Sequence, residues 1–135
     1  MSKLGLFCSC LECLFADESD KQDVTHKIAE RTAFFLETQP CRRKELFNQI
    51  KVAYNLRSNV LHGGMIPNEK VTKLEQVCIQ TDMILRKVFV RILTSKCSTP
   101  DFFSMFTTQE TQLKEYLSDL LFSIDRSSKE NSSVG

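Results

Sequence analysis

The chain has 135 residues, of which 41% are hydrophobic and 26% charged, and its formal net charge is +1. These values are typical of an ordinary globular protein that is long enough to bury one core. No uninterrupted apolar run approaches the roughly 18 residues that a membrane span requires, which excludes an integral membrane helix. Six cysteines without a targeting segment predict free thiols in a reducing compartment, here the cytoplasm.

Helical periodicity appears from the first residues. We expect Leu4–Phe15 to be a helix rather than a signal peptide, because it contains a glutamate and no clean cleavage site follows it. Ser19–Gln22 has the pattern of a capping box for a second helix. One side of that helix would carry four residues at helical spacing, namely Val24, Ile28, Thr32 and Phe35.

Two prolines and a polar tail divide the rest of the chain. Pro40 starts a third helix, and Pro67-Asn68 starts a long helix that runs to about Ser95. Thr107–Glu110 has the pattern of a capping box for a last helix, and the polar residues 126–135 are expected to be disordered. Five principal helices with short connections predict one all-α domain over residues 1–125, an antiparallel bundle.

Arg57 and His62 lie five residues apart, just before Gly63-Gly64. On a continuous helix their side chains would point roughly 140° apart. The glycines readily take positive φ and stop the helix, which lets His62 turn toward Arg57. Ser58 and Asn59 precede His62 by four and three residues, so either can hold the imidazole in one tautomer. A cation beside an imidazole suits phosphodiester chemistry.

Arg57 also falls on an apolar helical stripe. An unpaired charge there is costly, so Arg57 requires a partner, which can be a carboxylate, a second subunit or a bound phosphate. A buried structural arginine beside a capping histidine is the alternative interpretation, and spacing alone does not decide between them. The stripe consists of Leu46, Ile50, Ala53, Tyr54 and Leu61.

The segment Tyr54-Asn-Leu-Arg57-Ser58-Asn-Val-Leu-His62-Gly63-Gly64 resembles the R-x4-6-H signature of HEPN domains, in particular the ApeA-like branch. Upstream, Leu11-Glu12-Cys-Leu14-Phe15 and the helix from Lys27 to Leu36 are similar to the opening of that family. The resemblance covers about residues 4–64. Ser58 stands where the commonest family form has Asn, Asp or His. The resemblance implies a HEPN-like bundle that is either a metal-independent endoribonuclease of a defence or toxin system or a non-catalytic module that binds nucleotide, RNA or protein.

In the ribonuclease reading, the ribose 2′-hydroxyl attacks the adjacent phosphate. His62 is the general acid or base, Arg57 binds the phosphate, and Ser58 or Asn59 orients the imidazole, with Tyr54 as a further motif residue. The resemblance also implies a homodimer with both motifs in one cleft, and a larger defence complex or a linked sensor domain as a partner. No cofactor or metal is expected.

Two further features concern ligands. The cluster Cys8, Cys10 and Cys13 has no second ligand pair elsewhere, so we expect core thiols rather than a zinc site.

Residues 40–64 hold five basic residues against Glu45 alone, a net +4, which could draw RNA to the motif. The alternative is a solvated helix start with compensating acids nearby in space. The candidate RNA-binding residues in this segment are Arg42, Arg43 and Lys51.

Overall fold

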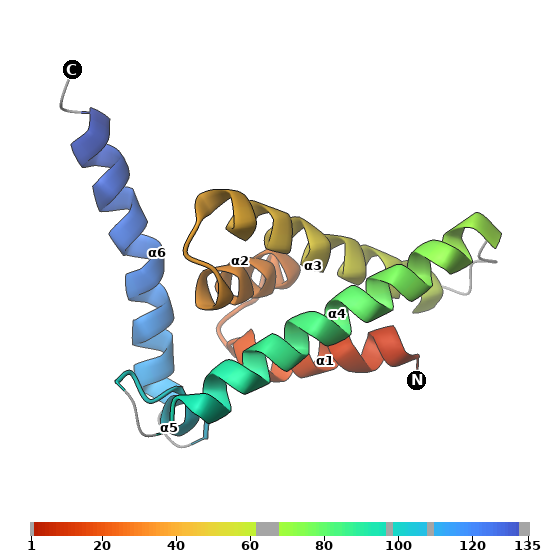
Figure 1. The fold of residues 1–135 in the computed structure, drawn as a ribbon, viewed down its shortest axis with the longest axis horizontal. Helices are drawn as coiled ribbons and strands as arrows, with labels where there is room; N and C mark the ends of the chain where they lie inside the picture. The colour runs from red at the N-terminus through yellow and green to blue at the C-terminus, as the bar shows by residue number, and fades with distance from the viewer. Residues whose placement is uncertain (1, 62–67, 97–98, 108–109, 133–135) are drawn as a thin grey trace. The chain divides into compact units, whose positions relative to one another are not determined.

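The computed structural model describes residues 2–61, 68–96, 99–107 and 110–132, which form helices and no strand (Figure 1). The all-α prediction is therefore confirmed. The described residues contain one helix more than the five expected, because a short helix lies between the two long C-terminal ones. The elements are α1 (Lys3–Phe15), α2 (Val24–Leu36), α3 (Pro40–Leu61), α4 (Asn68–Thr94), α5 (Phe102–Thr107) and α6 (Glu110–Ser132).

Helix α1 begins where the sequence predicts it. The Ser2 hydroxyl accepts a hydrogen bond from the Gly5 amide at 3.0 Å, which satisfies one of the amide groups that an α-helix leaves unpaired in its first turn. The buried side chains recur every three or four residues and form one apolar face. They are Leu4, Cys8, Leu11 and Phe15.

The start of α2 differs from the prediction. The helix begins at Val24 after Asp23, which has a φ of 53° and makes no side-chain capping bond, so the predicted Ser19–Gln22 capping box is wrong. The preceding turn uses aspartates instead. Asp17 accepts a hydrogen bond from the Ser19 amide at 3.2 Å, and Asp20 accepts one from the Asp17 amide at 2.9 Å. Aspartate side chains often compete in this way with helical capping.

Helices α1, α2 and α3 pack against one another, with α2 lying along α3 (Figure 1). The predicted apolar faces are the faces that meet. Phe15 and Phe35 have ring centroids 5.7 Å apart, a favourable separation for aromatic pairs. The other fully buried residues of α2 and α3 are Ile28, Ala29, Thr32, Ala33, Ile50 and Ala53.

The contacts group the chain into two compact units, residues 1–90 and 91–135. In the first unit, α4 buries residues at helical spacing, namely Val77, Thr81, Ile84, Leu85 and Val88. Helix α6 extends to Ser132, into the segment for which the sequence predicts disorder. The single domain over residues 1–125 and the disordered tail remain predictions. None of the helices that the structure describes has both the length and the apolarity to cross a membrane.

The second unit is organised around Phe102, the first residue of α5. Its ring packs edge-on against Tyr116 of α6, with the centroids 5.1 Å apart. Its backbone amide donates to the buried Ser95 hydroxyl at 2.9 Å. Asp101 caps α5 by accepting from the Ser104 amide at 3.1 Å, and this bond is the main cause that lowers the pKa of Asp101. Such a cap explains a six-residue helix that the apolar periodicity does not reveal.

Candidate functional site

Arg57 lies in the last turns of α3, and its Nη1 donates a hydrogen bond to Oε1 of Glu12 on α1. The side chain of Arg57 is 23% exposed and that of Glu12 is 35% exposed. Of the three partners that the sequence allows for Arg57, the structure therefore shows a carboxylate. The bond to Glu12 is the main cause that raises the pKa of Arg57, so the guanidinium remains charged.

Tyr54, one helical turn before Arg57, also connects α3 to α1. Its hydroxyl donates to the backbone carbonyl of Cys8 at 3.1 Å, and its ring centroid lies 5.8 Å from Cζ of Arg57. Burial raises the pKa of Tyr54 well above its ordinary value and that of the Cys8 thiol to about 11. Both groups are therefore protonated at neutral pH. Neither is suited to act as a base or as a nucleophile.

A pocket of about 260 Å³ opens beside Arg57. Three helices contribute to its wall: α1, the first turn of α2, and α3. Three hydroxyl groups that can donate and accept hydrogen bonds line the pocket together with the cation of Arg57 and the carboxylate of Glu12. The volume is below the range typical of sites for drug-sized ligands, and it is large enough to hold a small group such as a phosphate. The lining residues are Glu12, Val24, Thr25, Tyr54, Arg57 and Ser58.

The structure brings only part of the predicted motif together. Ser58 is exposed and lines the pocket, whereas Asn59 is exposed but does not line it. His62 lies outside the described residues, as do the glycines that follow it. The predicted pairing of His62 with Arg57 therefore stays a prediction.

The basic residues predicted to bind RNA do not gather around Arg57. Arg43 donates through Nε to the Glu37 carbonyl at 2.5 Å and covers the Phe34 ring, with Cζ 4.2 Å from the ring centroid. These contacts join the end of α2 to the start of α3. Burial lowers the pKa of Arg43.

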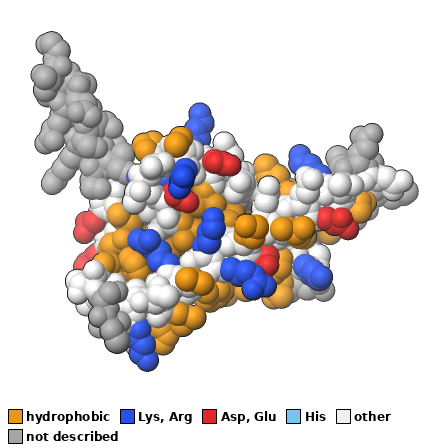
Figure 2. All heavy atoms as spheres, viewed as in Figure 1, with side chains coloured by type: hydrophobic (Ala, Val, Ile, Leu, Met, Phe, Trp, Pro, Cys, Tyr) orange, Lys and Arg blue, Asp and Glu red, His pale blue; other side chains and the backbone are white. Residues whose placement is uncertain are grey.

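The two other candidates lie elsewhere on α3. The exposed Arg42 precedes Arg57 by fifteen residues, roughly 22 Å along the helix axis. Lys51 precedes it by six residues and therefore points to another side of the helix. Lys and Arg side chains occur at many separate places on the face shown in Figure 2. Neither residue lines the pocket.

Glu12 and Thr25 are the polar residues of the pocket that the sequence did not single out as site residues. Glu12 directly follows Leu11 of the buried face of α1. The position of a carboxylate at the border of an apolar helical face could therefore have indicated that Glu12 pairs with a cation. Its match with an arginine on another helix depends on how α1 packs against α3, which sequence periodicity does not specify.

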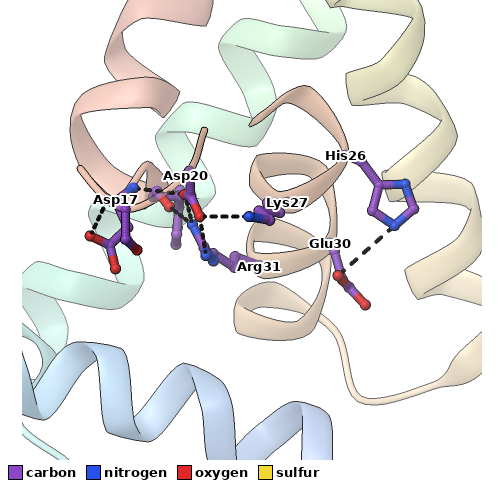
Figure 3. A network of polar contacts seen from close by, with 8 residues as sticks. Asp17, Asp20, His26, Lys27, Glu30 and Arg31 are labelled. Atoms are coloured by element: carbon purple, nitrogen blue, oxygen red, sulfur yellow. Dashed lines mark hydrogen bonds and ion pairs between the residues drawn. The ribbon is translucent and has the colours of Figure 1, made fainter. Parts of the chain in front are cut away.

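A second polar cluster joins the α1–α2 connection to α2 (Figure 3). The Asp20 side chain is 3% exposed and accepts hydrogen bonds from Arg31 Nη1 at 2.5 Å, Arg31 Nη2 at 3.1 Å and Lys27 Nζ at 3.1 Å. Arg31 also donates to the Phe15 carbonyl at 2.8 Å. The bonds from Arg31 are the main cause that holds the pKa of Asp20 far below its usual range. Both carboxylate oxygens of Asp20 already accept hydrogen bonds within the protein. We therefore assign this cluster a structural role, which is to fasten the α1–α2 connection to α2.

The cysteines differ from one another. Cys8 is buried as predicted, but Cys10 is half-buried and Cys13 is exposed, so the prediction that all three pack in the core is wrong for Cys13. The reason is their helical spacing, because residues two and five positions after Cys8 turn away from the buried face. Within the described ranges, no group of three or more His, Cys, Asp or Glu side chains lies close enough to hold a metal ion.

Comparison of the chain with protein-family models, with curated proteins and with solved structures finds no match.

Proposed function

We propose that the chain is a HEPN-like helical domain that cleaves RNA without a metal ion. The observation that carries this proposal is the placement of Arg57. Its guanidinium is partly exposed, is bonded to Glu12, and lines a pocket that is large enough to hold a phosphate. It also belongs to the Arg57–His62 motif, which resembles the R-x4-H signature of HEPN ribonucleases.

In the proposed reaction, the 2′-oxygen of the ribose attacks the adjacent phosphorus and the bond from phosphorus to the 5′-oxygen breaks. The products are a 2′,3′-cyclic phosphate and a free 5′-hydroxyl. Arg57 binds the phosphate oxygens and offsets the negative charge that develops on them. His62 takes the proton from the 2′-hydroxyl or gives one to the 5′-oxygen, a proton transfer for which enzymes use histidine most often.

One imidazole serves poorly as acid and base in a single step, so the proposal includes a homodimer that places two histidines in one cleft. The dimer and the defence or toxin role in the cytoplasm are supported by the resemblance of residues 4–64 to HEPN domains. The resemblance likewise supports a larger defence complex or a linked sensor domain as a partner. The closed two-fold symmetry usual for homodimers would place the two motifs equivalently.

The test compares RNA cleavage by wild type, Arg57→Ala, His62→Ala and Arg86→Ala. Arg86 is the matched control, because its side chain is 76% exposed and pairs within its own helix with Asp82. We expect the His62 variant to lose about 10²–10⁴-fold in rate, the usual contribution of a proton-transfer group, and the Arg57 variant to lose comparably. The control should cleave like wild type, and far-UV circular dichroism should be unchanged in all three variants.

Two conditions test the chemistry itself. Cleavage should persist in excess EDTA, since no step uses a divalent ion, and a 2′-deoxy substrate should resist cleavage, since it lacks the attacking hydroxyl. Wild-type rates in the His62 variant would contradict the proposed proton transfer. Loss of activity in EDTA that magnesium restores would contradict the metal-independent route.

The bond between Glu12 and Arg57 favours a second candidate, a non-catalytic HEPN module that binds nucleotide or RNA. Glu12 compensates the charge of Arg57, which is what a structural or purely binding role requires. This candidate predicts RNA binding that Arg57→Ala weakens, without cleavage by any form of the protein. A filter-binding titration run beside the cleavage assay separates the two functions.

A further inference from the structure

We propose that Glu12 shifts the selectivity of the pocket at Arg57 toward a singly charged phosphodiester and away from a phosphate group that carries two charges. The inference rests on the proposed function only in that Arg57 binds phosphate. Its basis is the direct bond between the two side chains and the fact that both line the same small pocket.

The donor arrangement of a guanidinium lets Glu12 and a phosphate bind Arg57 together. A guanidinium has five N–H donors arranged along two edges, and a phosphate takes two parallel bonds from one edge. Glu12 accepts from Nη1. The edge formed by Nε and Nη2 is the one on which a phosphate can be bound in two-point fashion. By accepting a hydrogen bond from Nη1, Glu12 restricts the positions that the guanidinium can take, so less side-chain freedom is lost when a ligand binds.

The charges set the selectivity. A lone arginine attracts a dianion more strongly than a monoanion. The pair of Glu12 and Arg57 has no net charge. Each additional negative charge on the ligand is therefore attracted by Arg57 but also repelled by the carboxylate of Glu12. For a charge about 5 Å from Glu12, the repulsion in water corresponds to about a fourfold weaker binding per added charge, and to more where water is excluded. Arg57 is the one cation among the described lining residues.

This selectivity matches the chemistry of an internal RNA linkage. Linkages inside a chain are diesters with one charge, whereas terminal phosphates and mononucleotides carry close to two charges at neutral pH. A pocket that contains Glu12 would favour the interior of a chain over its ends. It would also release a 3′-phosphate formed from the cyclic product.

The experiment measures the binding of two probes by calorimetry at low ionic strength and pH 7.5. One probe is thymidine 5′-monophosphate, a dianion. The other is thymidylyl-(3′,5′)-thymidine, a singly charged diester that lacks the 2′-hydroxyl and is not cleaved. The proteins are wild type, Glu12→Gln and Glu30→Gln. Glu30 is the matched control, because its side chain is 37% exposed against 35% for Glu12 and it does not line the pocket.

We expect wild type to bind the diester at least as tightly as the monoester. Glu12→Gln should shift the ratio of the two affinities toward the monoester by about fourfold or more, and Glu30→Gln should leave it unchanged. An unchanged ratio in Glu12→Gln overturns the inference, as does the absence of binding of either probe to wild type. If Glu12→Gln does not fold, the wild-type ratio decides, since tighter binding of the monoester by wild type is incompatible with the proposed selectivity.

Failure here is distinguishable from failure of the proposed function, because the titrations require no cleavage. RNA cleavage that depends on Arg57, together with a ratio that is insensitive to Glu12, would refute this inference alone. The expected shift in a protein that does not cleave RNA would refute the ribonuclease and leave the selectivity of the pocket standing.

Discussion

Replacing Asp20 by asparagine tests the polar cluster that fastens the α1–α2 connection to α2. The side chain is 3% exposed and accepts two hydrogen bonds from Arg31 and one from Lys27. Bonds to a charged group contribute about 1.5–3 kcal/mol each, and breaking a buried ion pair costs about 3–5 kcal/mol. Because Lys27 is 38% exposed, we discount its bond as screened by solvent and expect a loss of about 3 kcal/mol.

That loss corresponds to a fall in Tm of about 10–15 °C for a chain of this size, measured by circular dichroism at pH 7. Glu30→Gln is the control, because the Glu30 side chain is 37% exposed and its contact with His26 is 4.0 Å long; it should change the free energy of unfolding by no more than about 0.5 kcal/mol. A loss in Asp20→Asn no larger than in this control would refute the reasoning.

The pH dependence gives a second check on the same variant. The pKa of Asp20 is lower in the folded protein than in the unfolded chain, so its stabilising effect is fully present above the unfolded value of about 3.9. It is lost as the pH falls further, toward the folded pKa. The difference in free energy of unfolding between wild type and Asp20→Asn should therefore be constant from pH 7 to pH 5 and shrink below about pH 4. A difference that shrinks between pH 7 and pH 5 would indicate another titrating group.

Two further outcomes follow from the contacts between α1 and α3. Tyr54→Phe removes the bond to the Cys8 carbonyl and should lower the free energy of unfolding by about 1 kcal/mol in urea titrations; no measurable change would mean that the bond contributes nothing. Iodoacetamide at pH 8 should modify the exposed Cys13 and Cys41 and spare Cys8, because Cys8 is buried and its pKa is raised to about 11. Peptide mass spectrometry of the native protein measures the rate at each cysteine. Modification of Cys8 as fast as Cys13 would contradict this expectation.

Local sequence alone was sufficient to predict every described helix except α5. The apolar spacing of α1, the proline at the start of α3 and the restart at Asn68 predicted their ends closely, because helix boundaries depend on neighbouring residues. Two local predictions failed or fell short. Aspartate-to-amide bonds displaced the capping box before α2, and α5 is too short to show a helical period. The resemblance to HEPN domains, with His62 as its second motif residue, remains a prediction.

The sequence by itself determined that Arg57 sits on an apolar face and requires a compensating partner, since helical periodicity places it beside Ile50 and Tyr54. Only the tertiary structure decided that this partner is Glu12, forty-five residues earlier in the chain. The packing of the helices also places Thr25 of α2 at the pocket. The physical reason is that helical period determines which side of a helix a residue occupies, whereas the match between residues on different helices depends on how the helices pack.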